Sequence, residues 1–486
     1  MAYADFETFS LTIQPARMNN KRTLRLQYMF FDLAAAFIVW VLFMYFRQIV
    51  NDGKLFENVQ IYIPKYNFFS SLVVYPFFCL FINWLSGIYV QPLNHQKTTI
   101  LLSTFASSII ISITIFFFLL LDDVVVSYEF YYYSLLVLLG LHFTITFVFR
   151  LAIILTVKRN YRKKIWTTNT IIIGTGSNAQ KVSKELQRKA ERQTLIGFIS
   201  EKNRKTATPV PELTLGNMSQ IAMIIEKYHI EEAIIALDEN DEHALFSIIN
   251  ALFRFNIEIH FTARVYEILT GSAKVQEPGI SPLVSITSPS MSDWQISMKR
   301  FIDVTVSTVA LVILSPLFIF FAIRIKTDSK GTVFYRQERI GRYGRPFDIL
   351  KFRTMYKGAE NGIPRLSSSK DNRVTAAGRI LRKYRLDELP QFWNVLKGEM
   401  SLVGPRPERT YYINQIIETA PYYCLIYKIR PGLTSWGPIR IGYSDTIEKM
   451  VERLNYDIIY MDNMSLLIDL KIILQTAEVI FKGKGM

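Results

Sequence analysis

The pattern of apolar and polar positions changes twice along this chain, and each pattern predicts a different kind of element. The first part carries four uninterrupted apolar runs, at 29–46, 68–90, 99–121 and 131–157. Each is near the roughly 20 residues that a helix needs to cross a bilayer, so we predict four transmembrane helices within 1–165. The first run starts late and has no small-residue cleavage site after it, which favours an anchor over a cleavable signal peptide.

Basic residues at the ends of these runs predict how the helices are oriented. Lys21 and Arg22 precede the first run, and Lys158 and Arg159 follow the fourth. Because cytoplasmic flanks carry an excess of lysine and arginine, both flanks are expected in the cytosol. Asp32 interrupts the first run, as either a functional carboxylate inside the membrane or a structural polar contact between helices, and we prefer the second reading.

Short β-rich runs separated by helical stretches mark a second part, 166–265. The run that starts at Asn169 leads into Gly174-x-Gly176-x-x-Ala179 and then a helical pattern, which is the order strand, glycine turn, helix. Further short apolar runs follow at 195–199, 232–237 and 257–261. Together these runs predict a small Rossmann-like α/β domain.

The glycine turn leaves two alternatives for this domain. Backbone N–H groups at such a turn can approach a phosphate, so Gly174, Gly176 and Ala179 are candidate cofactor-binding positions. The acidic residue that usually binds a ribose about twenty residues later has no clear counterpart, which favours a purely structural turn. The domain is therefore either a nucleotide-sensing regulator or a packing and dimerisation module.

The last part, 296–486, follows a segment rich in Ser, Pro and Gly, 266–295, that we expect to be a linker. It opens with an apolar run over 301–325 that is long enough to span a bilayer. Lysine and arginine flank this run on both sides, which places both ends in the cytosol, and Ser315-Pro316 breaks the helix near its middle. We therefore predict a re-entrant helix rather than a kinked span or a buried core helix.

Composition and charge exclude several classes of protein. The 486 residues are 50% hydrophobic and 20% charged, which excludes a disordered or fibrous chain, and two cysteines exclude a disulfide scaffold. The formal net charge is +15, and basic residues concentrate between positions 336 and 385. This segment follows a membrane anchor and lacks the interleaved aromatic residues of a base-stacking surface. Phosphorylated substrates and lipid headgroups are therefore expected as partners, and nucleic acid is not.

Two adjacent acids, Asp387 and Glu388, stand directly after the basic residues Arg382, Lys383 and Arg385. Adjacent carboxylates among cations suggest divided roles. One can attack phosphorus, and the other can hold Mg²⁺, which is commonly bound by one or two carboxylates together with phosphate oxygens. Arginine and lysine nearby would stabilise the charge of a transferring phosphoryl group. Taken without their basic neighbours, the two acids would be read as a solvated helix end.

Eight short runs accompany these acids in a fixed order. They are Lys299-Arg-Phe-Ile-Asp303, Ser315-Pro316, Phe334-Tyr-Arg-Gln-Glu-Arg-Ile-Gly341, Lys351-Phe-Arg-Thr-Met355, Leu386-Asp-Glu-Leu-Pro-Gln391, Asn394-Val-Leu-Lys-Gly398, Ser401-Leu-Val-Gly-Pro-Arg-Pro407 and Arg430-Pro-Gly-Leu-Thr434. In this order they resemble the bacterial sugar transferase family, the polyprenyl-phosphate glycosyl-1-phosphate transferases. With its four-helix front and small α/β domain, the chain resembles the large form of that family, the undecaprenyl-phosphate hexose-1-phosphate transferase type.

This resemblance implies a fold and a reaction. The fold is membrane α plus α/β, with a mostly helical, membrane-associated catalytic domain that contains the re-entrant helix. The reaction moves a sugar 1-phosphate from a UDP-sugar to undecaprenyl phosphate and initiates lipid-linked exopolysaccharide, capsule or O-antigen synthesis. The expected place is the bacterial cytoplasmic (inner) membrane, with the catalytic domain on the cytosolic face, and the resemblance is compatible with a homodimer.

The resemblance also implies roles for single residues. Asp387 matches the family nucleophile, which would carry a covalent phosphosugar, and Glu388 matches the metal-binding acid for Mg²⁺. Arg382 and Arg406 match phosphate-binding arginines. The remaining matches are a basic pair for substrate or acceptor phosphate and a further family acid of open role, namely Lys351, Arg353 and Asp457.

Two positions depart from the family pattern, and two other functions stay open. Arg385 stands where a small hydroxyl residue is usual, and Gly437-Pro438 replaces the usual Ala-Gln, so neither the sugar nor the nucleotide can be carried over from other members. A membrane scaffold or regulator of polysaccharide assembly is the non-catalytic alternative, in which Asp387 and Glu388 cap a helix. A nucleotide-sugar dehydratase is the other alternative, and it requires a second Rossmann core in the last third.

Overall fold

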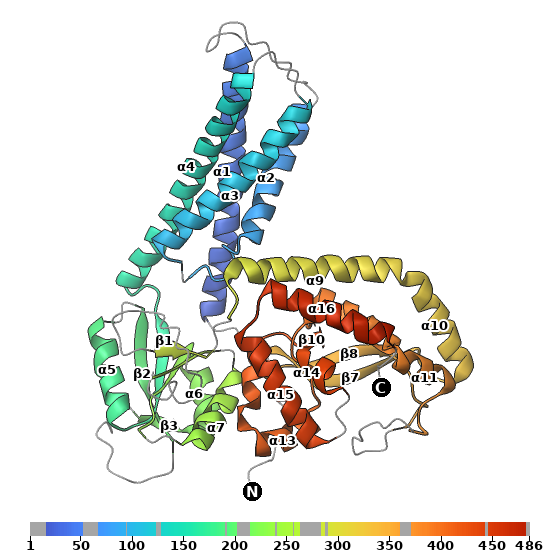
Figure 1. The fold of residues 1–486 in the computed structure, drawn as a ribbon. Coiled ribbons are helices and arrows are strands. Elements are labelled where there is room, and N and C mark those ends of the chain that lie inside the picture. The colour runs from blue at the N-terminus through green and yellow to red at the C-terminus, as the bar shows by residue number, and fades with distance from the viewer. Residues whose placement is uncertain are drawn as a thin grey trace. The chain divides into compact units, whose positions relative to one another are not determined.

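The computed structural model describes the chain in segments, at residues 16–51, 67–93, 95–122, 128–189, 192–201, 214–238, 241–255, 257–262, 283–286, 290–359, 371–442 and 446–482. It divides into two compact units (Figure 1). The first comprises Met1–Thr168 with Ser292–Met298, and the second comprises Asn169–Met291 with Lys299–Met486.

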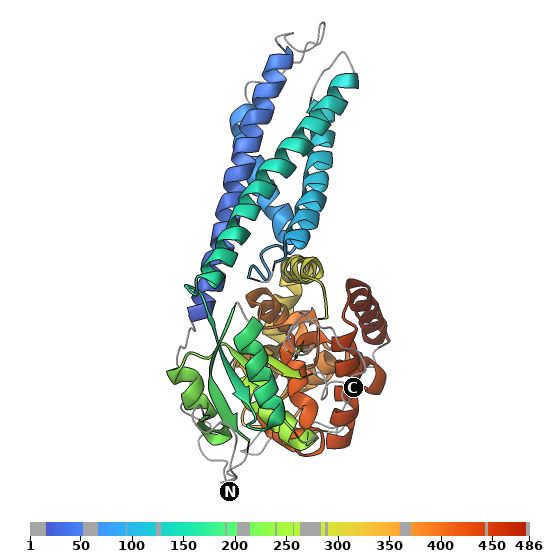
Figure 2. The ribbon, with the colours of Figure 1, turned by 90° about the vertical axis from the view of Figure 1, so that its left-hand side faces the viewer.

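The first unit is built on four helices that run alongside one another in both views (Figures 1 and 2). They are α1 Ala16–Asn51, α2 Asn67–Leu85, α3 Lys97–Asp122 and α4 Tyr128–Arg162. Among the described residues, three unbent helical stretches are long and apolar enough to cross a membrane, namely Lys21–Val50, Lys97–Leu120 and Glu129–Arg162. The apolar stretch of α2, Ser70–Leu85, is shorter, so the second predicted span stays a prediction.

Asp32 joins two of these helices. Its carboxylate accepts hydrogen bonds from Arg150 Nε at 2.9 Å and Arg150 Nη2 at 2.7 Å, so α1 and α4 are tied by a bidentate ion pair. Arg150 also donates to Thr104 of α3, and the Tyr89 hydroxyl donates to Asp32. Both charged side chains are buried and paired, as charges in an apolar bundle need to be, and the structural reading of Asp32 agrees with these contacts.

The second unit begins with a doubly wound sheet of order β3-β2-β1-β4-β5-β6. Its strands are β1 Thr168–Ile173, β2 Gln193–Ser200, β3 Thr214–Asn217, β4 Glu232–Ile235, β5 Glu258–Thr262 and β6 Leu283–Ser285. Strands β1 to β5 pair in parallel, and β6 pairs antiparallel with β5 at the edge. The predicted Rossmann-like α/β domain is therefore present. Strand β6 lies inside the segment 266–295 predicted as a linker, so the sheet continues beyond 265; residues 263–282 and 287–289 lie outside the described ones.

Helices cover both faces of this sheet because its central strands are apolar on both sides. Helix α5 Ser177–Lys189 packs against Ile172 and Ile234, whereas α6 Ile221–Lys227 and α7 Glu242–Phe253 pack against Ile171 and Ile235. The α7 face extends to the 3₁₀ helix Pro421–Lys428, whose buried Cys424 belongs to the same core. Asn250 of α7 donates to the Pro421 carbonyl at 3.2 Å. This domain therefore packs directly on the last third of the chain.

The apolar run of the last third forms two helices with a bend of 60° between them, α9 Asp293–Ile313 and α10 Ser315–Asp328. The break falls at the predicted Ser315-Pro316, because proline cannot donate a backbone hydrogen bond. The Ser315 hydroxyl donates to the Val312 carbonyl at 2.8 Å, which satisfies one acceptor at the break. Apolar side chains on both arms, including Val309, Val312 and Phe320, remain exposed. This geometry is that of a broken span or a re-entrant loop.

Short helices and two small sheets form the remainder of the last third. Strands β7 Phe334–Ile340 and β8 Pro346–Phe352 form an antiparallel hairpin, and β9 Ser401–Val403 and β10 Gly432–Thr434 pair in parallel. The helices are α11 Ala376–Lys383, α12 Phe392–Lys397, α13 Thr410–Thr419, α14 Trp436–Ile441, α15 Ile447–Asp462 and α16 Leu466–Phe481, with further 3₁₀ turns at Arg342–Gly344 and Leu386–Gln391. The described residues of the last third thus form no second doubly wound sheet, which the dehydratase alternative requires.

Candidate active site

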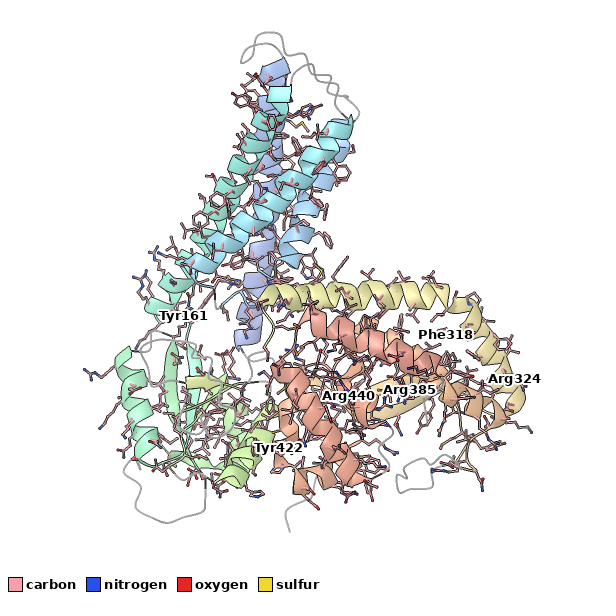
Figure 3. The ribbon with its side chains drawn as sticks, viewed as in Figure 1. Tyr161, Phe318, Arg324, Arg385, Tyr422 and Arg440 are labelled. Atoms are coloured by element: carbon pink, nitrogen blue, oxygen red, sulfur yellow. The ribbon has the colours of Figure 1, made fainter. Side chains whose placement is uncertain are left out.

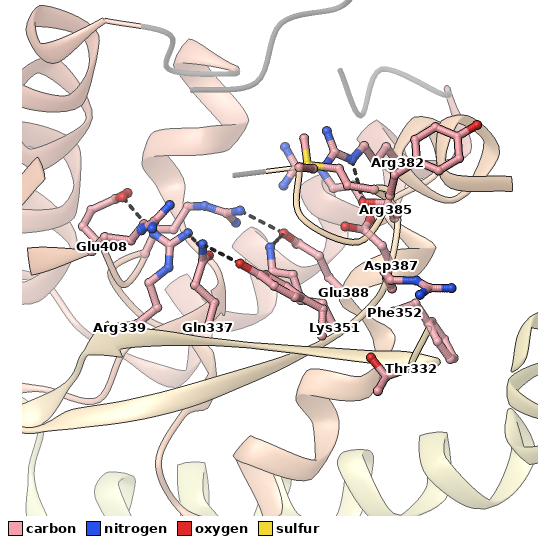
Figure 4. A pocket seen from close by; sticks show the side chains of 18 of the residues that line it. Thr332, Gln337, Arg339, Lys351, Phe352, Arg382, Arg385, Asp387, Glu388 and Glu408 are labelled. Atoms are coloured by element: carbon pink, nitrogen blue, oxygen red, sulfur yellow. Dashed lines mark hydrogen bonds and ion pairs between the residues drawn. The ribbon is translucent and has the colours of Figure 1, made fainter. Parts of the chain in front are cut away.

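Asp387 and Glu388 lie in the short 3₁₀ helix Leu386–Gln391, at the wall of a cavity of about 880 Å³. Arg385, which precedes this helix, adopts a left-handed backbone with φ 53°, and Leu386 packs against a core that contains Phe352 of β8 and Leu381 of α11. The chain therefore turns sharply after α11 and presents consecutive acids to the cavity. Figure 4 shows both carboxylates above the β7–β8 hairpin.

Two cations hold Glu388. Lys351 Nζ lies 3.0 Å and Arg406 Nη2 lies 2.8 Å from the same carboxylate oxygen, Oε1. Lys351 comes from β8 and Arg406 from the loop after β9, so three separate segments meet at one oxygen. Burial opposes the charge of Glu388, but Arg406 and Lys351 outweigh it and hold its pKa well below the usual range. Glu388 is therefore an anion at neutral pH.

Asp387 is in a different electrostatic state. Burial raises the pKa of Asp387 to about 6, with Lys351 opposing the rise and the charge of Glu388 adding to it. Two neighbouring carboxylates whose pKa values are pushed apart by their surroundings are typical of sites that divide chemical roles between them. Near neutral pH, Asp387 is thus an unprotonated and poorly solvated carboxylate, as a nucleophile needs to be.

The other predicted phosphate ligands lie on the same cavity wall, but they have different neighbours. Arg382 lines the cavity and donates from Nε to the Thr354 hydroxyl at 2.9 Å. The guanidinium of Arg353 donates to the carbonyl oxygens of Lys330 and Ser329, each at 2.8 Å. Arg353 is 7% exposed and ties the end of α10 to β8, so its role as a phosphate ligand stays a prediction.

Comparison with known proteins decides the family. Residues 294–483 match the family model of the bacterial sugar transferases. A UDP-glucose:undecaprenyl-phosphate glucose-1-phosphate transferase of Caulobacter vibrioides is 42% identical over 180 residues, which are 37% of this chain and 67% of the relative. The chain belongs to the bacterial sugar transferase family. The resemblance of the motifs is thereby confirmed.

Other relatives of this sugar transferase carry different names. The exopolysaccharide production protein ExoY of Sinorhizobium fredii is 36% identical over 202 residues, 38% of this chain and 87% of the relative. A UDP-N-acetylgalactosamine-undecaprenyl-phosphate N-acetylgalactosaminephosphotransferase of Aeromonas hydrophila is 35% identical over 230 residues, 47% of this chain. The chain spans 54% of that relative, about half its length. Residues 85–263 match a second family model, described as a CoA-binding domain.

The sequence analysis missed a group of paired charges next to Arg406, the predicted phosphate ligand. Glu408 accepts from Arg339 Nη1 at 3.1 Å through one carboxylate oxygen and pairs with Arg453 of α15 through the other. All three side chains line the cavity. Glu408 directly follows Arg406-Pro407, and this position in the motif was the one sequence feature that could have pointed to it. Its partners Arg339 and Arg453 lie 69 and 45 residues away in the chain, so the sequence does not show the pairing.

Asp457 lies on α15, one helical turn after Arg453, with 2% of its surface exposed. Burial raises its pKa to about 7, and Arg453 opposes that rise. The side chain is packed behind the cavity wall that Arg453 lines. A contact with substrate therefore receives no support from the geometry, and the role of Asp457 stays open.

The glycine turn of the Rossmann-like domain is filled by a side chain of the protein itself. Asp238, which follows β4, accepts hydrogen bonds from the backbone N–H groups of Ser177 and Asn178, each at 2.8 Å. A Cβ atom at Gly176 would lie 1.6 Å from Asp238 Oδ2, so glycine is needed here to admit the carboxylate. Buried Ala179, in the first turn of α5, packs in the core between this helix and the sheet. These contacts favour the structural turn over an open phosphate site.

We expect neither coenzyme A nor NAD⁺ to bind at this turn of the full-length protein. The carboxylate of Asp238 already uses the amide groups that a diphosphate would need. Amide hydrogen exchange of the segment 174–186 should be unchanged by millimolar ligand. Asp238→Ala should speed exchange in this segment, whereas Asp241→Ala, which removes the cap of α7, should not. Protection of the segment by either ligand in the wild-type protein would contradict the structural reading.

The side chains around Asp387 and Glu388 offer few ligands for a metal ion. Among the described residues, no group of three or more His, Cys, Asp or Glu side chains could enclose a metal ion. The two adjacent carboxylates nevertheless fit Mg²⁺, which commonly takes one or two carboxylates and completes its shell with water and phosphate oxygens. Glu388 is in contact with Lys351 and Arg406, and both cations line the same cavity as Asp387.

Proposed function

We propose that the chain is a membrane enzyme that transfers a sugar 1-phosphate from a UDP-sugar to undecaprenyl phosphate. The observation that carries this proposal is the half-buried pair of acids whose pKa values are shifted in opposite directions, in a cavity whose walls are rich in arginine and lysine. The names of the relatives from Caulobacter and Aeromonas support the same reaction class. The sugar stays open, since those names specify two different ones.

The proposed first step is attack by a carboxylate oxygen of Asp387 on the phosphorus that bears the sugar. The bond from that phosphorus to the bridging oxygen of the diphosphate breaks, and uridine monophosphate leaves with the electron pair. The product is an acyl phosphate between Asp387 and the sugar 1-phosphate. Arg406 and Lys351 are placed to neutralise charge on the phosphoryl oxygens, and Arg382 extends the cationic wall.

The proposed second step regenerates the enzyme. A phosphate oxygen of undecaprenyl phosphate attacks the same phosphorus, the acyl phosphate bond breaks, and the Asp387 carboxylate is released. A diphosphate link between lipid and sugar results. Mg²⁺ would be held by Glu388 together with substrate phosphates, where it supplies positive charge to the diphosphate. The exopolysaccharide name of the Sinorhizobium relative supports a role in starting a lipid-linked surface glycan, whether exopolysaccharide, capsule or O-antigen.

The membrane arrangement belongs to this proposal. Four transmembrane helices in the bacterial inner membrane would hold the cytosolic catalytic domain, and α9 and α10 would enter and leave the cytosolic leaflet as a re-entrant pair. The 60° bend at Ser315-Pro316 and the exposed apolar side chains on both arms support that reading. A homodimer is part of the proposal only by family resemblance.

Release of uridine monophosphate tests the proposed function. Detergent-solubilised full-length protein is incubated with undecaprenyl phosphate, Mg²⁺ and a panel that includes UDP-glucose and UDP-N-acetylgalactosamine. We expect continuous release with at least one sugar, and we expect chelation of the metal by EDTA to stop it and added Mg²⁺ to restore it. Folded protein that releases nothing across the panel would favour the scaffold alternative, and release that survives chelation would remove Mg²⁺ from the proposal.

A further inference from the structure

One side chain of the α9–α10 pair reaches the active-site cavity. Among the described residues that line it, Lys326 is the one that these two helices contribute. It lies in the last turn of α10 and is exposed. The other lining residues come from the hairpin, from the segments around α11 and from the part of the chain after β9. The cavity is therefore lined at one point by a helix that also carries exposed apolar side chains.

Helical periodicity places Lys326 at the end of a lipid-facing stripe. Ile319, Ile323 and Lys326 are spaced four and three residues apart, so they lie on one face of α10. Ile319 is 63% exposed and Ile323 is 62% exposed, and neighbouring Phe320 is 60% exposed. The opposite side of the helix is packed, since Phe318 and Ile325 contact Phe352 and Leu381. A lysine one turn beyond an apolar face extends its ammonium group to the level of the headgroups.

The position of this lysine is fixed relative to the reacting acids. Arg353, directly after β8, donates to the Ser329 and Lys330 carbonyl oxygens directly after α10. Asp328, at the end of α10, accepts from the backbone N–H of Ala377 at the start of α11 at 3.0 Å. Strand β8 also carries Lys351, and α11 carries Arg382. The end of α10 is thus joined to both segments that supply cations to the cavity.

We propose that Lys326 binds the phosphate of the lipid acceptor, with the isoprenoid chain lying along Ile319, Phe320 and Ile323. This assignment rests on the proposed function. The acceptor is amphipathic: its phosphate has to reach a buried carboxylate while its chain stays in apolar surroundings. Lys326 is the point where the apolar stripe of α10 meets the cationic cavity wall. The UDP-sugar needs no apolar face and has no corresponding reason to use this lysine.

The two half-reactions allow a test with a matched control. Lys326→Ala is compared with Arg324→Ala, because Arg324 is also an exposed basic residue near the end of α10 but does not line the cavity (Figure 3). We expect Lys326→Ala to raise the KM for undecaprenyl phosphate by about 10- to 100-fold, the loss of one charge-assisted contact. The KM for the UDP-sugar and the burst of uridine monophosphate without lipid should be unchanged, and Arg324→Ala should behave as the wild type.

Each other outcome has a defined meaning. An unchanged lipid KM in Lys326→Ala, or an equal rise in the KM for the UDP-sugar, would overturn the assignment. An equal effect of Arg324→Ala would mean that any basic residue here attracts the anionic membrane surface. A short, detergent-soluble prenyl phosphate distinguishes binding of the lipid phosphate from attraction to the membrane surface. The Lys326→Ala defect should persist with this acceptor. A defect that is seen only in bilayers would overturn the proposal. A wild-type protein that turns over with lipid but shows no lipid-independent burst would contradict the covalent step, and one that releases no uridine monophosphate even with lipid would refute the proposed function.

Discussion

Asp387→Asn should abolish turnover, with a loss on the order of 10³-fold or more, because an amide cannot form the acyl phosphate on which both half-reactions depend. The exchange keeps the size of a buried side chain, so the fold should be retained. Uridine monophosphate release is measured together with the thermal unfolding midpoint. Asp348→Asn is the matched control, since Asp348 is an exposed acid on β8. Activity of Asp387→Asn above about a tenth of wild type would contradict the role of the nucleophile.

The pH dependence of the burst rate is an independent test of Asp387 as the nucleophile. Since burial raises the pKa of Asp387 to about 6, the reactive unprotonated form is fully present well above that pH and is lost as the pH falls through it. The rate of the lipid-independent burst should follow this acid limb. Asp348→Asn should leave the limb in place. A burst rate that stays constant as the pH falls through about 6, in protein that remains folded, would contradict the electrostatic account of Asp387.

Arg406→Ala should have the second largest effect, a loss of about 10²- to 10³-fold in kcat/KM for the UDP-sugar. Arg406 contacts Glu388 at 2.8 Å, and in the proposed mechanism it stabilises charge on the transferring phosphoryl group. Removing it also leaves Lys351 as the single cation in direct contact with the Glu388 carboxylate among the described contacts. Arg406→Lys should recover part of the activity, because lysine keeps the charge but loses the planar fork of donors.

An arginine that does not line the cavity supplies the control for that series. Arg440 at the end of α14 is exposed and does not line the cavity, so Arg440→Ala should retain wild-type kinetics. Both variants are compared by steady-state release of uridine monophosphate at varied UDP-sugar, with the unfolding midpoint as a check of the fold. A loss of less than about threefold in Arg406→Ala would mean that the phosphate contacts lie elsewhere in the cavity.

The sequence predicted the elements that depend on interactions between residues close together in the chain. Hydropathy located α1, α3 and α4, and Ser315-Pro316 located the break between α9 and α10. The motif around Asp387 and Glu388 located the acids, and the strand-glycine-helix pattern located β1 and α5. Each of these features is determined by residues within a few positions of one another. A run of apolar side chains predicts a helix in the membrane, and a proline without a backbone donor predicts a break.

Non-local contacts explain what the sequence did not predict. Glu388 and Lys351 are 37 residues apart and meet only because the hairpin passes under the 3₁₀ helix. Asp238 enters the glycine turn from 61 residues further along, so the turn looks like an open phosphate site in the sequence. Strand β6 has three residues, too few to show alternation, and Arg353 finds its backbone partners in a loop. Side-chain identity alone cannot distinguish a phosphate ligand from a structural arginine.

Direct detection of the covalent intermediate tests the central claim. Wild-type protein in detergent is mixed with the accepted UDP-sugar and Mg²⁺ without undecaprenyl phosphate, quenched, and analysed by intact mass and peptide mapping. The account predicts about one equivalent of uridine monophosphate and a mass increase of one sugar phosphate, located on the peptide that contains Asp387 and discharged when lipid is added. Protein that turns over with lipid but forms neither burst nor adduct without it would contradict the account, because the sugar phosphate would then pass directly from nucleotide to lipid.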